Sequence, residues 1–526
     1  MIITNLHSPA TPRNAITNLD DGLIMRWSTH ADIENVGELV KEAFRWITFS
    51  GVPDGVFPGP NLVFAAASKR LLSGKNAVMT DRDYALVEDT KCESGKNPIV
   101  ACVSLHRLRA YYGCVDLIFG KPELIATNPE YRNRGLIRKL LFEMIHPESE
   151  ARGDALQVIP GIPHFYRLVS DMKIFNMDLR KTQFGYEYAL VSYTSGKIEN
   201  VQSIPPLAEG KTAEPFSLRS ATPDDIPYLI SMSTKERVSP YTQLGLYYGP
   251  EYWQYTVKDI FEIEDPKYPG SRGTQVVVDA ATGKDVGYTI VSYTFGFKLE
   301  ALVLDESVVM QEALYPILRQ LIAVEKKRLE EKKAKMAEAE ANTINTTSFY
   351  MLLQLHPKHP ATALLGSKMV PSTTAPGFRM FTRIHDYPKF IRAVSPELEK
   401  RLAESPMAGT TGRLRLDFYR KVEGNKAKGL EIIFEKGKII ETSDWANPGH
   451  EKTAEEYLAW KAENKIPVVY AAAFAPLTVN ALFTGERSLE DLIWSYGETN
   501  VKNEDSKLLL NSLFPKISQH IDTFYW

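Results

Sequence analysis

A short basic turn between an apolar run and a helical pattern constrains this chain more than any other segment. The turn, Thr127-Asn-Pro-Glu-Tyr-Arg132-Asn-Arg-Gly135, directly follows the apolar residues Leu124, Ile125 and Ala126. Beyond Gly135, apolar side chains recur at helical spacing as far as Ile145. The segment therefore predicts a strand, a tight turn and a helix, which together aim backbone N–H groups and the positive end of a helix at one point. Such a point is suited to binding an anion.

Three residues of the turn strengthen this interpretation. Gly135 allows the backbone to approach a bulky anion closely, because glycine carries no Cβ. Arg132 and Arg134 can add charge-assisted hydrogen bonds to phosphate oxygens. The alternative is an ordinary basic start of a helix without a ligand, and the residues alone leave that alternative open.

The spacing Arg132-x-x-Gly135-x-Ile137 resembles the (Q/R)-x-x-G-x-(G/A) pyrophosphate loop of the GCN5-related N-acetyltransferases, or GNATs. Ile137 departs from the pattern, since GNATs usually have a small residue there. The sequence Arg134-Gly-Leu-Ile-Arg138 is also similar to the loop of one GNAT branch, the Eis (enhanced intracellular survival) family. This resemblance implies acetyl-CoA as cosubstrate. Its pyrophosphate would lie on Arg132, Asn133, Arg134, Gly135, Leu136 and Ile137, and its pantetheine arm would pair with Leu124, Ile125, Ala126 and Thr127.

Length and composition bound the remaining possibilities. At 526 residues the chain is too long for one hydrophobic core, and about three domains are expected. The net charge of −3 and the lack of a broadly basic region argue against a nucleic-acid partner. No apolar run is long enough to span a membrane, and the three widely spaced cysteines form no metal motif. We expect a cytoplasmic protein without a metal site.

A faint internal repeat divides the chain. Arg26-Trp-Ser-Thr29-His-Ala-Asp32-Ile33 and Arg219-Ser-Ala-Thr222-Pro-Asp-Asp225-Ile226 each read as a strand end, a helix cap and a helix start. Both are similar to the beginning of a GNAT domain, although such short strand–cap–helix starts are common. The second copy has Asp305 and Glu306 where the phosphate loop is expected, and these acids would repel a phosphate. We therefore predict that the second copy does not bind CoA.

These patterns predict an α+β protein with two tandem GNAT-like domains, each a mixed central sheet flanked by helices. The expected ranges are 20–195 for the CoA-binding domain, 196–215 for a linker and 216–386 for the degenerate second domain. The strand and helix order of 387–526 resembles the sterol-carrier-protein-like α/β domain that ends Eis proteins.

Two catalytic residues are implied by the resemblance to Eis proteins. Tyr166, in Gly161-Ile-Pro-His-Phe-Tyr166, stands where those proteins have a tyrosine that protonates the CoA thiolate, and Tyr186 and Tyr188 are alternatives. The chain ends with Trp526, whose α-carboxylate corresponds to the terminal carboxylate that reaches into the Eis active site. The structural alternatives are a tyrosine packed in the core and a hydrophobic tail docked on a surface.

The sequence thus predicts an acyltransferase that moves an acetyl group from acetyl-CoA directly to a primary amine of a small molecule. Eis proteins favour aminoglycosides, polyamines and lysine side chains, and a homo-oligomer is compatible with the resemblance. The alternative function is a non-catalytic carrier that holds an apolar ligand in the third domain.

Overall fold

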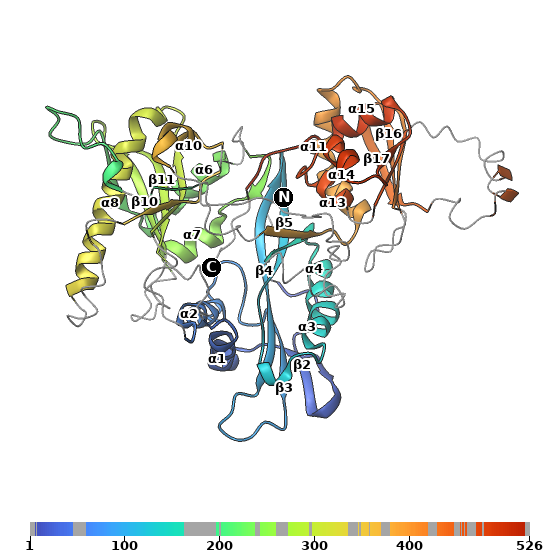
Figure 1. Cartoon of the computed structure of the whole chain (residues 1–526), viewed down its shortest axis with the longest axis horizontal. Coiled ribbons are helices and arrows are strands. Elements are labelled where there is room, and N and C mark those ends of the chain that lie inside the picture. Colours follow the sequence, from blue (N-terminus) through green and yellow to red (C-terminus); the bar gives the residue numbers. More distant parts are fainter. Residues whose placement is uncertain are drawn as a thin grey trace.

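A computed structural model describes residues 6, 8–45, 59–161, 196–198, 201–236, 242–258, 272–293, 297–334, 346, 349–356, 358–369, 379–418, 429–446, 453, 455–456, 458–459, 470–475 and 478–520. Helices and mixed sheets alternate along these residues, which confirms the predicted α+β class. Three separate sheets organise the molecule, and Figure 1 shows the second and third on opposite sides of the tall β4–β5 hairpin, which belongs to the first.

The first sheet has nine strands and carries the predicted anion loop. Its main path is β1-β2-β3-β4-β5-β6-β14, and β9 pairs with both β4 and β20. The strands are β1 (Ile16–Asn18), β2 (Leu23–Trp27), β3 (Tyr84–Asp89), β4 (Ile99–Tyr112), β5 (Val115–Thr127), β6 (Leu156–Gly161), β9 (Leu244–Leu246), β14 (Arg379–Arg383) and β20 (Gln519–His520). Short 3₁₀ turns, η1 (Asp20–Gly22), η2 (His30–Asp32) and η3 (Pro129–Tyr131), connect some of them.

Helices cover both faces of this sheet. On one face lie α1 (Ile33–Ala43) and α2 (Leu62–Leu71), whose apolar side chains join the large core cluster around Tyr84 and Phe119. On the other face lies a continuous helical run of α3 (Leu136–Lys139), the π-helical turn η4 (Leu140–Ile145) and α4 (His146–Arg152) (Figure 1). Pro147 explains the π turn, because proline offers no N–H to continue the α-helical hydrogen-bond ladder.

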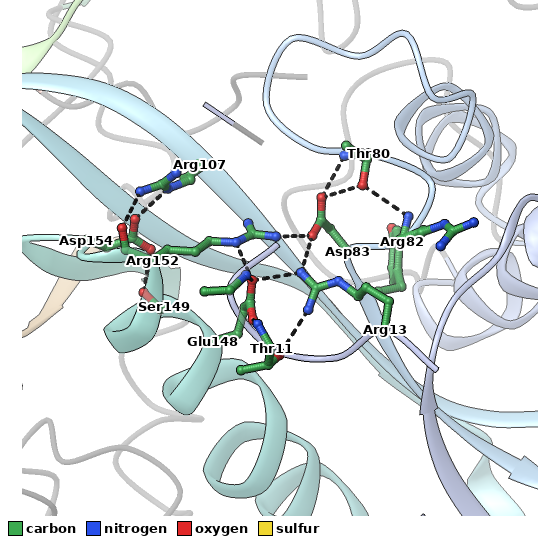
Figure 2. A network of polar contacts seen from close by, with 12 residues as sticks. Thr11, Arg13, Thr80, Arg82, Asp83, Arg107, Glu148, Ser149, Arg152 and Asp154 are labelled. Carbon is green, nitrogen blue, oxygen red and sulfur yellow. Dashed lines mark hydrogen bonds and ion pairs between the residues drawn. The ribbon is translucent and has the colours of Figure 1, made fainter. Parts of the chain in front are cut away.

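A buried network of charged side chains holds α4, the last part of this helical run, against the sheet (Figure 2). Arg13 Nη2 lies 2.8 Å from Asp83 and 2.9 Å from Glu148, and Arg152 pairs with the same two carboxylates. The backbone N–H and hydroxyl of Thr11 also donate to Glu148. All four charged side chains are at most 5% exposed. The N-terminal segment is therefore an integral part of the first sheet's packing.

The second sheet repeats features of the first. Its path is β7-β13-β12-β11-β10-β8. Its elements are β7 (Gly196–Ile198), η7 (Val201–Ser203), β8 (Phe216–Ser220), η8 (Pro223–Asp225), α6 (Ile226–Glu236), α7 (Pro250–Val257), β10 (Arg272–Asp279), β11 (Asp285–Ser292), β12 (Lys298–Leu304), α8 (Met310–Ala334), β13 (Met351–Leu353), α10 (Pro360–Leu365) and η10 (Gly366–Lys368).

The two helix starts that suggested the repeat have the same construction. Thr29 and Asp32 form a capping box, and Arg26 pairs with Asp32 at 2.7 Å. Thr222 and Asp225 form the same box, and Arg219 pairs with Asp225 at 2.7 Å. An identical cap and ion pair at both places follows from the shared Arg-x-x-Thr-x-x-Asp spacing.

The third sheet has the path β17-β16-β15-β18-β19. Its elements are α11 (Tyr387–Ala403), β15 (Gly412–Phe418), β16 (Gly429–Glu435), β17 (Lys438–Asp444), β18 (Tyr470–Phe474), α13 (Thr478–Phe483), α14 (Leu489–Ser495), β19 (Asn500–Val501) and α15 (Glu504–Leu513). Its likeness to a sterol-carrier-protein domain stays a prediction.

Strands from distant parts of the chain complete the first sheet. β14 pairs with β6, although its residues fall in the range expected for the second domain. β9 pairs with β4, and β20 joins β9 after the chain has passed through the third sheet. The Tyr112 hydroxyl also donates to the carbonyl of Phe483 at 2.9 Å. Strand pairing therefore crosses the boundaries of the domain ranges expected from the sequence, and those ranges stay predictions.

Candidate active site

The predicted anion loop lies between β5 and α3 and has an unusual backbone. Asn133 and Gly135 both have positive φ, at 64° and 71°, and α3 begins immediately after them. None of the backbone N–H groups from Asn133 to Ile137 donates a hydrogen bond within the part of the chain that the structure describes. Apart from Gly135 and its two neighbours in the chain, no heavy atom of the described residues lies within 4 Å of the position that a Cβ on Gly135 would occupy. The loop thus presents a set of unused donors around an open space, as an anion site requires.

Basic side chains surround this space. Arg134 pairs with Asp21 at 2.8 Å, and both side chains are well exposed, so a stronger anion could replace this weak pair. Arg132 is exposed and forms no ion pair within the described residues. The Tyr131 hydroxyl donates to Asp89 at 2.5 Å, and this bond raises the pKa of Tyr131 to about 12. Tyr131 thereby ties the loop to the end of β3.

Beside the loop, β5 and β6 separate. These parallel strands pair only at Phe119 with Leu156 and at Gly120 with Gln157. Both strands continue past these pairs, to Thr127 and Gly161. The edge of β5 from Leu124 to Thr127, where the pantetheine arm was predicted, therefore has no paired β6 residue within the described part of the chain. An unpaired strand edge offers the alternating N–H and C=O groups that an amide-containing arm can use.

A β-bulge distorts β5 at the start of this free edge. Leu124 and Ile125 together lie opposite Val103 of β4, because the register shifts between the Cys102–Ala126 and Ser104–Glu123 pairs. Leu124 has a positive φ of 47°, which is strained for a side chain of its size. Bulges of this kind re-aim backbone groups and occur next to active sites.

A buried pair of charges precedes the bulge and was not predicted from the sequence. Glu123 is 13% exposed, and its Oε2 lies 2.9 Å from Nζ of Lys121, which is fully buried. Burial raises the pKa of the Glu123 carboxyl, and Lys121 and the Leu124 N–H partly offset this rise. A carboxylate of raised proton affinity beside an open strand edge is suited to accept a proton. The available signal was Lys-x-Glu within the otherwise apolar run Leu117–Ala126.

The predicted residues are only partly brought together. The ten residues predicted to bind the cosubstrate lie along the bulge, the free edge and the loop. Tyr166, its alternatives Tyr186 and Tyr188, and Trp526 lie outside the described residues. The strand that leads toward Trp526, β20, is parallel to β9 and therefore antiparallel to β4. It runs in the same direction as β5, toward the end of the sheet that carries the bulge and the loop.

The corresponding turn of the second sheet carries a carboxylate of its own. A carboxylate oxygen of Asp305 accepts the N–H of Ser307 at 3.1 Å and its hydroxyl at 2.8 Å. The turn after β12 thus presents a negative charge that is held on one of its own backbone N–H groups. β12 and β13 also pair at only two positions, but His359 lies next to their opening, with Nε2 3.0 Å from the carbonyl oxygen of Leu302. These contacts support the prediction that this copy does not bind CoA.

Comparison with solved structures identifies the fold. No family model and no curated protein matches the sequence. A GCN5-related N-acetyltransferase from Kribbella flavida is 14% identical with a TM-score of 0.53, covering 95% of this chain and 98% of that one. A GCN5-related N-acetyltransferase from Anabaena variabilis is 13% identical with a TM-score of 0.53, covering 95% of this chain and 99% of that one.

This chain has the GNAT fold. The likeness spans nearly the whole chain, so it includes the third sheet as well as the two that the repeat predicted. Within the described residues, no helix has both the length and the apolar character needed to cross a membrane. The same residues contain no cluster of three side chains suited to holding a metal ion.

Proposed function

We propose that this GNAT-fold chain is an acetyl-CoA-dependent N-acetyltransferase acting on a primary amine of a small molecule. The observation that carries the proposal is the set of unused N–H donors from Asn133 to Ile137, beside the unpaired edge of β5. Pyrophosphate on the donors and the pantetheine arm along the edge would place the thioester near the Leu124 bulge. The second sheet has the same overall plan, but the carboxylate of Asp305 lies on the N–H of Ser307 in the corresponding turn and would repel a phosphate.

The reaction forms a bond between the acceptor nitrogen and the acetyl carbon and breaks the bond between that carbon and the CoA sulfur. The acceptor nitrogen loses a proton, and the departing thiolate gains one. Glu123 is the proposed base, because burial raises the pKa of its carboxyl and it lies directly before the bulge. Tyr166 is the proposed acid, since a phenol is a weak enough acid to hold its proton until a thiolate forms. The Trp526 carboxylate is the rival base.

Several finer points belong to the same proposal. The resemblance to Eis proteins favours an aminoglycoside-, polyamine- or lysine-like acceptor. It also favours a cytoplasmic location, a sterol-carrier-protein-like third domain and a homo-oligomer. Eis proteins have the GNAT fold, and the shared fold is what supports these points.

A thiol-release assay tests the proposal. The full chain is incubated with acetyl-CoA and a panel of small primary amines, and free CoA is measured with a thiol reagent, while mass spectrometry identifies the acetylated amine. We expect release that depends on at least one amine and gives an N-acetyl product. Binding of an apolar ligand without any acetyl transfer would instead favour the carrier function.

The anion loop yields a sharp test of cosubstrate binding. Gly135→Asp places a carboxylate among the free donors, as Asp305 does in the second sheet, whereas Gly135→Asn adds a neutral side chain of the same shape that tolerates positive φ. Two charges about 4 Å apart interact by roughly 1–4 kcal/mol near a protein surface. We expect calorimetry to show at least roughly tenfold weaker acetyl-CoA binding for Gly135→Asp than for Gly135→Asn. Equal affinities would place the pyrophosphate elsewhere.

A further inference from the structure

We propose that Lys121 is a positioning residue that holds the Glu123 carboxylate ionised and in place before the bulge of β5. This inference rests on the proposed function, because it assigns a role to the neighbour of the proposed base. Lys121 and Glu123 are two residues apart on β5, so both side chains project from the same face of the sheet, the face that α1 and α2 cover. Their charged atoms are 2.9 Å apart.

Burial of the charged Lys121 side chain costs desolvation free energy. It is fully buried, and a buried ion pair is at best about as stabilising as a well-packed apolar pair of similar size. Fold stability alone therefore gives no reason for a lysine here. A lysine is useful at this position if its partner must be negatively charged in a place where burial favours the neutral carboxylic acid.

The groups of β4 that lie near this pair are uncharged near neutral pH. From β4, Ser104 donates to the carbonyl of Glu123 at 2.8 Å, and its hydroxyl lies 3.1 Å from Nε2 of His106. Burial, with a smaller contribution from Lys121, lowers the pKa of His106 well below its usual value, and burial raises the pKa of Cys102 to about 12.

The groups on β3 and α1 that lie on this face are also uncharged near neutral pH. Burial raises the pKa of Tyr84 on β3 well above its ordinary value, and Ser68 of α2 lies close to its hydroxyl. The buried residues of α1 are apolar or glycine. Near neutral pH, Lys121 is therefore the one cation that faces Glu123 among these described side chains.

The geometry also holds the carboxylate in place. Nζ of Lys121 lies 2.9 Å from Oε2 of Glu123, and the N–H of Leu124, the first residue of the bulge, also helps to lower the pKa of this carboxyl. The ion pair restricts the rotation of the carboxylate. Glu123 lies directly before the bulge and beyond Gly120, the last residue of β5 that pairs with β6, which is where the proposed reaction occurs.

The test compares two variants that each remove one buried cation from the first sheet. Lys121→Met removes the partner of Glu123. Arg107→Met is the matched control, because Arg107 is a buried β4 residue that pairs with Asp154 at 2.7 Å on the opposite face. The acid limb of the pH profile of kcat/KM reports the base of the free enzyme. We expect Lys121→Met to move this limb upward by about one to three pH units, and Arg107→Met to leave it in place.

A second measurement does not depend on activity. Infrared difference spectra over a pH titration show the protonated carboxyl of Glu123 as a band that Glu123→Gln removes. We expect this band to persist to higher pH in Lys121→Met. An unmoved band and an unmoved acid limb in folded Lys121→Met would overturn the inference. A shifted band in a chain that transfers no acetyl group would overturn the proposed function but leave the coupling of the two side chains standing. If Lys121→Met does not fold, Lys121→Gln replaces it in both measurements.

Discussion

Glu123→Gln should lower turnover by roughly 10²–10⁴-fold, the usual contribution of a general base, while acetyl-CoA binding stays within about twofold. The amide keeps the size of the side chain but cannot accept the proton of the amine. The predicted pyrophosphate and pantetheine contacts involve the loop and the backbone of β5, which this change does not alter. Steady-state kinetics with the best acceptor of the thiol-release panel, together with calorimetry for acetyl-CoA, measures both quantities.

Asp116→Asn is the matched control, since Asp116 is an exposed carboxylate at the opposite end of the same strand. It should keep normal turnover. If Glu123→Gln is active and a few residues added after Trp526 abolish turnover, the carboxylate of Trp526 is the base instead. Tyr166→Phe completes the series, because loss of the acid should slow thiolate departure in either case.

The buried charge network should make Arg13→Met one of the most damaging substitutions in the chain. Removal of one partner of a buried pair costs roughly 3–5 kcal/mol, because the remaining charges are left uncompensated. Here Asp83 and Glu148 would share Arg152 alone (Figure 2). Hydrogen exchange measured by mass spectrometry on peptides from β3 and β4 reports the local free energy of opening, and we expect it to fall by about that amount.

Lys69→Met provides the control for this substitution. Lys69 pairs with Glu34 at 2.5 Å, but both side chains are exposed, so its loss should cost less than about 1 kcal/mol. Similar protection in Arg13→Met and in the unmodified chain would contradict the role of the network.

The network also predicts a pH dependence. Burial opposes ionisation of Glu148, but hydrogen bonds from Arg13, Thr11 and the N–H of Ala10 outweigh it and lower the pKa of Glu148 to about 2. A carboxyl whose pKa is lower in the folded state stabilises the fold above its unfolded pKa, and this contribution is lost as pH falls toward 2. The protection of β3 and β4 should therefore fall between about pH 4.5 and pH 2, and less so in Arg13→Met.

Local features of the fold were predictable because they depend on neighbouring residues. The strand, turn and helix around Gly135 follow from apolar spacing and from the one residue that adopts positive φ without strain. The capping boxes at Thr29 and Thr222 follow from spacing as well. The positive φ of Asn133 was not predicted, although asparagine tolerates it better than most residues.

Long-range features were not predictable, since their energies depend on partners far along the chain. β14 and β20 are short, and nothing within them indicates that they join a sheet more than 200 residues away in sequence. Glu148 reads as an ordinary surface glutamate on a helix until Arg13 and Asp83 pack against it. Glu123 is similar, because its burial next to Lys121 depends on the helices that cover β5.

The way β9, β14 and β20 join the first sheet has a consequence for biosynthesis. A ribosome makes the loop and the bulge early, but the sheet that holds them is complete only after residue 520 has emerged. Many domains fold one after another as they leave the exit tunnel, and here the first body instead waits for the last. Until β9 and β14 have been made, the edges of β4 and β6 that they cover are exposed, which makes the nascent chain dependent on protection from premature pairing.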